Sequence, residues 1–153
     1  MVFHDRRMTY ECQYCSTIYI PEPDSQGVRV YPEAARHKCP HCLVPLVWAD
    51  LEGFPAEICP RCRGLLFKQD LFAKMVKFLR AHARTPGLEP KPVPWEDLEE
   101  YVNCPACQQP MSTHVYGGPG NIVIDTCVNC QLIWLDYLEL RRVLDTSGRD
   151  RAM

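Results

Sequence analysis

The sequence predicts a small α+β fold that is stapled by metal ions, and three observations carry this prediction. All ten cysteines fall into five C-x-x-C pairs, and four of these pairs form two sets with similar spacing. Fourteen prolines interrupt the 153-residue chain, which favours short modules joined by stiff connectors. Modules of about forty residues bury too little apolar surface to be stable alone, so bound metal is expected to supply the missing stability.

The N-terminal knuckle segment, residues 1–36, contains the C-x-x-C pair that has no obvious partner. Cys12 and Cys15 are followed by β-branched and aromatic residues at 16–20, which predict a strand. A loop rich in proline separates this strand from a second one at 28–31, and residues 32–36 are expected to form one helical turn.

Two histidines could complete a third metal site with this pair. His37 stands just before the next cysteine pair, and His4 stands eight residues before Cys12. Neutral imidazole commonly joins thiolates on zinc, so the third site would consist of Cys12, Cys15, His37 and His4. The alternatives are a vestigial knuckle, a redox-active pair, or a site shared between two chains.

The first ribbon with its helix occupies residues 37–84. Its cysteines form two C-x-x-C pairs that bracket sixteen residues, 43–58. Each pair is expected to form a knuckle, and two knuckles complete a tetrahedral tetrathiolate site, as in a zinc ribbon. The predicted strands are 44–50 and 56–58, followed by a helix over 69–84. The metal ligands assigned here are Cys39, Cys42, Cys59 and Cys62.

The helix over 69–84 has one apolar and one basic face. Leu71, Met75, Phe78 and Leu79 recur at helical spacing and are expected to pack on the ribbon. The opposite face carries Lys74, Lys77, Arg80 and Arg84, which is either a solvated surface or an anion contact.

Residues 85–103 are expected to act as a proline-rich and acidic linker. Prolines and a glycine at 85–94 end the preceding helix and favour extended backbone. The acidic stretch 95–101 predicts a short helix that packs Trp95 and Leu98 on a neighbouring module.

The second ribbon with its helix and tail occupies residues 104–153. Its two C-x-x-C pairs bracket nineteen residues, 108–126, so a second tetrathiolate site is expected. Asp136, followed three residues later by Glu139, resembles a capping box and predicts the start of a helix. The metal ligands assigned here are Cys104, Cys107, Cys127 and Cys130.

The two ribbons are tandem copies of one unit. Equivalent residues are 65 positions apart at the first knuckle, as in Cys39 and Cys104, and 68 apart from the third cysteine onward, as in Cys59 and Cys127. The three additional residues lie near the glycine-rich stretch 117–120, where a turn tolerates an insertion.

Residues 39–72 and 104–140 resemble the bacterial zinc-finger family named after transcription factor IIB. The second copy carries the family pattern, with Leu132 in place of a glycine. The first copy retains the cysteines and Gly64 but has Leu66, Lys68 and Leu71 where the pattern has Trp, Asp and Glu. The resemblance implies a ribbon fold, structural zinc and a context in transcription. The matching residues in the second copy are Cys104, Pro105, Cys107, Pro110, Cys127, Cys130, Trp134, Leu135, Asp136, Glu139 and Leu140.

Residues 10–21 also resemble the opening of rubredoxin. This resemblance implies that Cys12, Cys15, Cys39 and Cys42 share one metal, which could be iron because soft tetrathiolate sites bind both metals. Cys59 and Cys62 would then have no partners.

The sequence contains no pattern that indicates an active site. Catalytic zinc keeps an open coordination position, whereas two sets of four thiolates would close both metals to water. We therefore expect a non-enzymatic zinc-binding adaptor that presents ribbon and helix surfaces to a protein partner. The alternatives are a nucleic-acid-binding protein that uses the basic helix together with Arg141 and Arg142, and an electron-transfer protein with rubredoxin-like iron.

Composition bounds the partner and the compartment. A net charge of −2 and a pI near 6.2 predict weak affinity for nucleic acid. The sequence has no run of about 20 apolar residues and no signal peptide at its start, so we expect a cytoplasmic protein with reduced thiols and no membrane contact. The partner, the oligomeric state and the choice between zinc and iron stay open.

Overall fold

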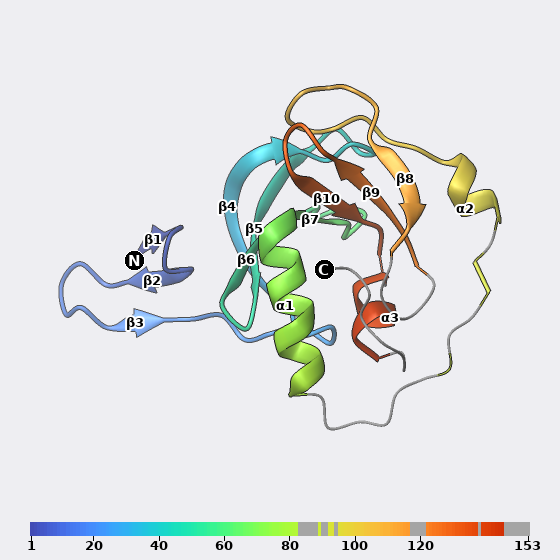
Figure 1. Cartoon of the computed structure of the whole chain (residues 1–153). Helices are drawn as coiled ribbons and strands as arrows, with labels where there is room; N and C mark the ends of the chain where they lie inside the picture. Colours follow the sequence, from blue (N-terminus) through green and yellow to red (C-terminus); the bar gives the residue numbers. More distant parts are fainter. Residues whose placement is uncertain (83–88, 90–91, 94, 117–121, 138, 146–153) are drawn as a thin grey trace.

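The computed structural model describes residues 1–82, 89, 92–93, 95–116, 122–137 and 139–145, which form two antiparallel sheets and three helices (Figure 1). A small sheet at the N-terminus has the strand order β1-β2-β3, and the large sheet has the order β4-β5-β6-β7-β10-β9-β8. The elements are β1 (Val2–His4), β2 (Thr9–Glu11), β3 (Ile18–Tyr19), β4 (Arg29–Lys38), β5 (Pro45–Leu51), β6 (Phe54–Ile58), β7 (Leu65–Lys68), α1 (Gln69–Ala81), α2 (Trp95–Glu99), β8 (Ser112–Val115), β9 (Val123–Cys127), β10 (Leu132–Leu135) and α3 (Glu139–Asp145).

The large sheet joins the two ribbons into one body. Strands β5, β6 and β7 come from the first ribbon and β8, β9 and β10 from the second, and the sheet is continuous because β7 pairs with β10. The expectation of modules separated by a connector is therefore wrong for the ribbons themselves. Each third strand would otherwise expose an unpaired edge, and pairing the two edges satisfies the backbone groups of both.

The pairing between β7 and β10 follows an approximate twofold axis. Leu66 lies opposite Trp134, and these two residues are equivalent under the 68-residue repeat offset. The flanking pairs, Leu65 with Leu135 and Phe67 with Ile133, exchange under the same offset. Two copies of one surface thus meet each other, which is the arrangement of an isologous dimer built within a single chain.

Strand alternation divides the residues of β7 and β10 between two buried clusters. Leu65, Phe67, Ile133 and Leu135 belong to the main core, which α1 and α3 cover. Residues on the opposite face, such as Leu66 and Trp134, belong to a second cluster that contains the cysteines of both ribbons. The metal-binding side and the helical side of the sheet are therefore distinct.

Helix α1 packs through a face slightly different from the predicted one. Its buried side chains are Phe72, Met75 and Val76, whereas Phe78 is 41 % exposed and rests against Phe54 at the margin of the core. The helix ends at Ala81, and the predicted residues 83–84 lie outside the described part of the chain.

Strand β4 crosses the expected boundary between residues 36 and 37. The helical turn expected at 32–36 is wrong, because these residues continue an edge strand that pairs with β5. The register shifts between Val30 and Ala34 and again between Ala34 and Lys38, so the strand lacks the regular alternation that sequence analysis relies on.

The small sheet attaches to β4 through aromatic side chains. Tyr31 is fully buried, and the rings of Phe3 and Tyr10 lie 5.1 Å and 5.8 Å from its ring. The Tyr31 hydroxyl lies 2.6 Å from the Met8 carbonyl oxygen and 2.7 Å from the Asp50 carboxylate. These contacts order the segment that carries Cys12 and Cys15.

Helix α2 forms where the acidic stretch predicted it, but its apolar residues stay open to solvent. Trp95 is 63 % exposed and Leu98 is 42 % exposed, so the expected packing of these side chains on a ribbon is wrong. Among the described residues, no helix has the length and apolar character required to cross a membrane.

Candidate metal centres

All five C-x-x-C pairs adopt the same knuckle backbone. In the pair that begins at Cys39, the Cys39 N–H donates to the Val44 carbonyl, and the Leu43 N–H donates to the Cys39 carbonyl, both at 2.9 Å. The residue after each second cysteine has a left-handed conformation, which side chains other than glycine rarely adopt. These residues are Ser16, Leu43, Arg63, Gln108 and Gln131, with φ between 54° and 63°.

Eight of the cysteines converge as two sets of four. In each set the sulfur atoms lie within 4.8 Å of one another, and the pairs Cys39–Cys62 and Cys107–Cys127 are 3.7 Å apart. A tetrahedral zinc with Zn–S bonds of ~2.3 Å requires sulfur atoms ~3.8 Å apart, so both sets fit this ion. Each set leaves no coordination position for water.

Backbone N–H groups and burial tune these thiols. The Cys42 N–H donates to the Cys39 sulfur at 3.2 Å, and the Ala106 N–H donates to the Cys104 sulfur at 3.4 Å. Burial raises the pKa of the Cys39 and Cys104 thiols in the metal-free sets. A divalent cation reverses this effect because it binds the thiolate form, so metal binding should release protons.

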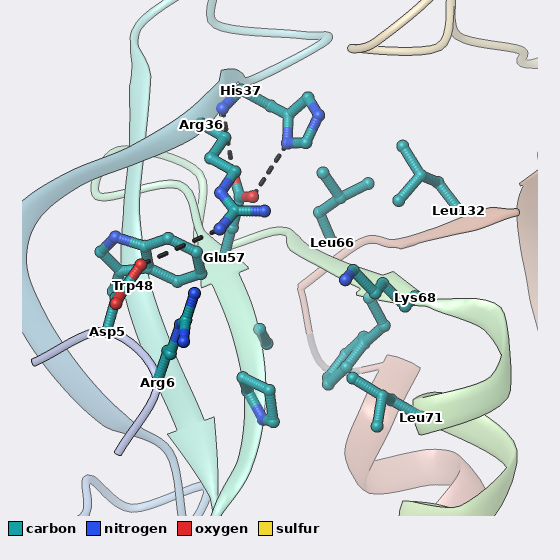
Figure 2. Close-up of a pocket in the computed structure, with 13 residues that line it drawn as sticks. Asp5, Arg6, Arg36, His37, Trp48, Glu57, Leu66, Lys68, Leu71 and Leu132 are labelled. Atoms are coloured by element: carbon teal, nitrogen blue, oxygen red, sulfur yellow. Dashed lines mark hydrogen bonds and ion pairs between the residues drawn. The ribbon is translucent and has the colours of Figure 1, made fainter. Parts of the chain in front are cut away.

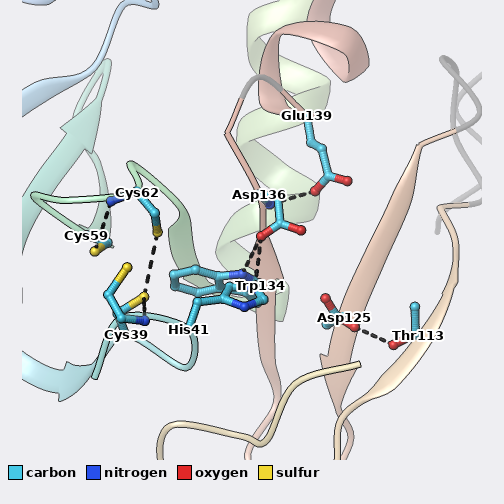
Figure 3. A network of polar contacts seen from close by, with 10 residues as sticks. Cys39, His41, Cys59, Cys62, Thr113, Asp125, Trp134, Asp136 and Glu139 are labelled. Carbon is cyan, nitrogen blue, oxygen red and sulfur yellow. Dashed lines mark hydrogen bonds and ion pairs between the residues drawn. The ribbon is translucent and has the colours of Figure 1, made fainter. Parts of the chain in front are cut away.

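A polar network connects the first metal site to the second repeat (Figure 3). His41 lies inside the Cys39–Cys42 knuckle, and its Nε2 is 3.2 Å from the Asp136 carboxylate. The Trp134 indole donates to the same carboxylate oxygen at 3.0 Å, and the Glu139 carboxylate accepts from the Asp136 N–H at 2.6 Å. Only the last contact, which is half of a capping box, was predicted from sequence.

Each repeat also buries one carboxylate at the equivalent place. Glu57 and Asp125 are 68 positions apart, and both are more than nine-tenths buried. Thr113 donates to Asp125 at 2.5 Å, whereas Glu57 lies 2.8 Å from His37 Nδ1. Sequence analysis missed both acids, although an acidic residue at the same offset within two apolar strands was a usable signal.

The depressions above these two acids differ in charge. The one in the second repeat is lined by acids, and burial raises the pKa of Glu139 to about 8. The one in the first repeat, which we name the basic groove, carries Lys68 and Leu71 at the positions of Asp136 and Glu139. The basic groove is lined by Asp5, Arg6, Arg36, His37, Trp48, Pro55, Ala56, Glu57, Leu66, Phe67, Lys68, Leu71 and Leu132.

Gly64 and Trp134 form a complementary pair across the twofold axis. A Cβ atom at Gly64 would lie 2.2 Å from Cζ2 of Trp134, so the completely buried indole requires glycine there. The equivalent positions are Leu132 and Leu66, which belong to the same buried cluster. The departure at Leu132 is therefore explained, because the smaller Leu66 leaves room for a side chain that Trp134 does not.

The third site expected from sequence is not assembled among the described residues. Cys12 is half-buried and Cys15 exposed, and only the two cysteine sets group three or more ligand side chains in the described part of the chain. His4 lies 3.5 Å from Glu11, and His37 is held by Glu57. The rubredoxin-like grouping is also wrong, because Cys39 and Cys42 face Cys59 and Cys62.

These features define the class as a tandem zinc-ribbon protein. The chain matches the transcription factor IIB-type zinc-ribbon family, described as a transcription factor zinc-finger, over residues 38–77 and 103–146. The two matches cover more than half of the chain, so the protein belongs to this family, as the cysteine pattern predicted. No curated protein and no solved structure matches the chain.

Proposed function

We propose that the protein is a non-enzymatic, cytoplasmic adaptor that binds two structural zinc ions and uses the basic groove to hold an acidic segment of a protein partner. The observation that carries this proposal is the difference between the repeats at equivalent places. In the second repeat the depression is lined by Asp125, Asp136 and Glu139, so the chain's own acids give it a negative charge. In the first repeat the basic groove instead carries Arg36 and Lys68 beside Trp48.

The groove has the chemistry of a peptide-binding surface (Figure 2). Trp48 and Arg36 form one side, with the Arg36 guanidinium 5.6 Å from the Trp48 ring centre, and Lys68 and Leu71 form the other. Aromatic and arginine side chains often dominate binding energy at interfaces. An aromatic or aliphatic side chain flanked by carboxylates would complement both the apolar floor and the cationic rim.

Its cations are available for a partner. Among the described residues, Arg6 and Lys68 make no ion pair, and the Arg36–Asp5 contact is long at 3.9 Å and exposed. Exposed pairs of this kind contribute ~0–1 kcal/mol, so a partner carboxylate could displace Asp5 at little cost. Glu57 is already bound by His37 and does not compete for the rim.

The basic helix face is a weaker candidate. Lys74 and Lys77 are exposed, but Arg80 donates to the Val143 carbonyl at 2.7 Å and so links α1 to α3. Arg141 pairs with Asp145, and Arg84 lies outside the described residues. These contacts favour a structural role for part of this face.

Nucleic acid is the second candidate ligand, because Trp48 beside three cations is also suited to stacking a base and pairing its phosphates. The family description makes transcription the first cellular context to examine. Steep salt dependence would distinguish a nucleic-acid ligand from a peptide.

The test uses the charge-reversed variant R36E/K68E and the matched control K74E/K77E, which has the same charge change outside the groove. Proteins captured from the source cell by the zinc-loaded chain are compared by quantitative mass spectrometry, and the best candidate is purified for calorimetry. We expect direct binding that the groove variant weakens at least tenfold and the control preserves. The proposal would be refuted if both variants lost partner binding equally, or if every captured protein bound the groove variant as well as the unaltered chain. Anisotropy with a labelled oligonucleotide provides the nucleic-acid arm.

A further inference from the structure

The fifth knuckle is fully formed although the chain supplies it with no second knuckle. The Cys12 N–H donates to the Thr17 carbonyl and the Ser16 N–H donates to the Cys12 carbonyl, both at 2.9 Å. Ser16 has a φ of 56°, as unfavourable as the equivalent residues in the four other knuckles. A vestigial pair would have no reason to keep this conformation.

The chain has no unused thiolate or imidazole to complete the site. Every cysteine and histidine of the sequence lies in the described residues. The other eight cysteines form the two closed sets. His4 lies opposite Thr9 on the β1–β2 ladder. Thr9 precedes Cys12 by three residues, so His4 and Cys12 are separated by ~10 Å along the strand direction. The remaining histidines contact Glu57, Asp136, the Phe78 carbonyl and the Ser112 carbonyl.

The position of the knuckle leaves it open to another molecule. The β2–β3 connection projects from the small sheet on the side away from both ribbons (Figure 1). Cys15 is exposed, and the nearby apolar side chains are also exposed, from 48 % at Ile20 to 99 % at Tyr14. Residues 12–21 carry no charge, so two copies of this surface can meet without like-charge repulsion.

We propose that Cys12 and Cys15 form half of a tetrathiolate zinc site that the same two cysteines of a second copy of this chain complete. Two identical knuckles around a twofold axis supply four sulfur ligands, which is the number that a structural zinc requires. The ion replaces one proton on each of the four thiols and links the chains without oxidation. The contact would also cover Tyr14, Ile18 and Tyr19.

A second copy fits better than an unrelated protein for two reasons. It necessarily presents a knuckle of the same geometry at the same concentration, and residues 12–21 around the knuckle carry no charge of their own that would repel an identical segment. The two ribbons of each chain already meet in this isologous manner through β7 and β10.

Native mass spectrometry of the full chain, purified with a phosphine reductant, tests the proposal by counting chains and zinc ions together. Two sites per chain and one shared site give five zinc ions per dimer. We expect this dimer for the unaltered protein and a monomer with two zinc ions for C12S/C15S. The single variant C15S, which changes only the exposed cysteine, should give the same loss if the double variant misfolds.

Two controls separate the proposal from its competitors. H4A should keep the five-zinc dimer, since His4 lies against Glu11 and is not a ligand, and K74E/K77E should keep it because these two exposed lysines lie on α1. A monomer with three zinc ions, a two-zinc monomer at every protein concentration, or an unchanged dimer in C12S/C15S would each overturn the proposal. A disulfide between Cys12 and Cys15 in the reduced preparation would do so as well.

Discussion

The two repeats share a backbone fold, but they place different side chains at the approximate twofold axis between them. The second repeat places Trp134 across the axis against Gly64, and its Asp136 contacts His41 in the Cys39–Cys42 knuckle of the first repeat. The first repeat presents Leu66 against Leu132 and leaves a groove rimmed by Arg36 and Lys68. The second repeat therefore supplies the side chains that stabilise the contact between the repeats, and the first repeat can differ from it in charge.

This comparison gives a structural reason why the Trp and Asp of the family motif are present in only one copy. Trp134 and Asp136 contact the first repeat as well as each other, so one copy of these residues links the two repeats. Lys68 and Leu71, at the places of Asp136 and Glu139, are then under no such constraint.

Removing either metal site should produce the largest effect. We expect C39S/C42S and C104S/C107S each to unfold both ribbons, because structural zinc contributes on the order of 10 kcal/mol and β7–β10 pairing makes the sheet one unit. Circular dichroism and zinc analysis check this expectation. If one variant retains one zinc and half of the folded signal, the repeats are independent.

Trp134 and Leu66 occupy equivalent positions but should differ in cost. Both are at least 98 % buried, and Trp134→Ala should destabilise the protein more than Leu66→Ala, within ranges of ~3–5 and ~2–5 kcal/mol respectively. The Trp134→Ala change removes more buried apolar surface than Leu66→Ala and also leaves Asp136 without its indole donor. Urea denaturation of the zinc-loaded variants gives both values, and equal costs would contradict the asymmetry.

Gly64→Ala should be nearly as harmful, because its Cβ would meet the Trp134 ring at 2.2 Å. We expect a loss of ~2–3 kcal/mol from overpacking. The double variant G64A/W134L should be more stable than the sum of the single changes predicts, since leucine leaves room for the methyl group. Additive free energies of unfolding would show that Gly64 does not accommodate the indole.

Replacing Glu139 should give the smallest effect, which is a change in how the free energy of unfolding depends on pH. Burial raises its pKa to about 8, so between pH ~4.5 and 8 the folded state holds a proton that the unfolded state has lost. Stability from this group is present below pH ~4.5 and falls as pH rises to about 8. Because Glu139 is partly exposed, we expect E139Q to recover only ~1 kcal/mol at pH 8. Thermal unfolding at pH 6 and 8 measures it.

The local units of the fold could be predicted from residue spacing alone. Two cysteines with two residues between them fix each knuckle, and the β-branched and apolar residues between the pairs form the hairpins. The ribbons, the helices and the eight clustered cysteines were therefore predictable. Asp136 and Glu139 predicted a helix start because the contact that they make spans three residues. All of these interactions join residues within a single repeat, and the regular spacing of those residues can be recognised in the sequence.

The way in which the units combine depends on contacts between residues that are far apart in the chain. The contact between His41 and Asp136 spans 95 residues, and the pairing of β7 with β10 joins strands on opposite sides of the proline-rich segment. No periodicity encodes which strand edges meet, because that choice depends on surface complementarity after each ribbon has formed. The fit of Gly64 to Trp134 follows from that pairing, whereas the contact of His37 with Glu57 depends on how β4 and β6 pack within the first repeat. The basic groove needs both, because its lining combines residues of the first repeat with Leu132 and with Asp5 and Arg6 of the N-terminal segment.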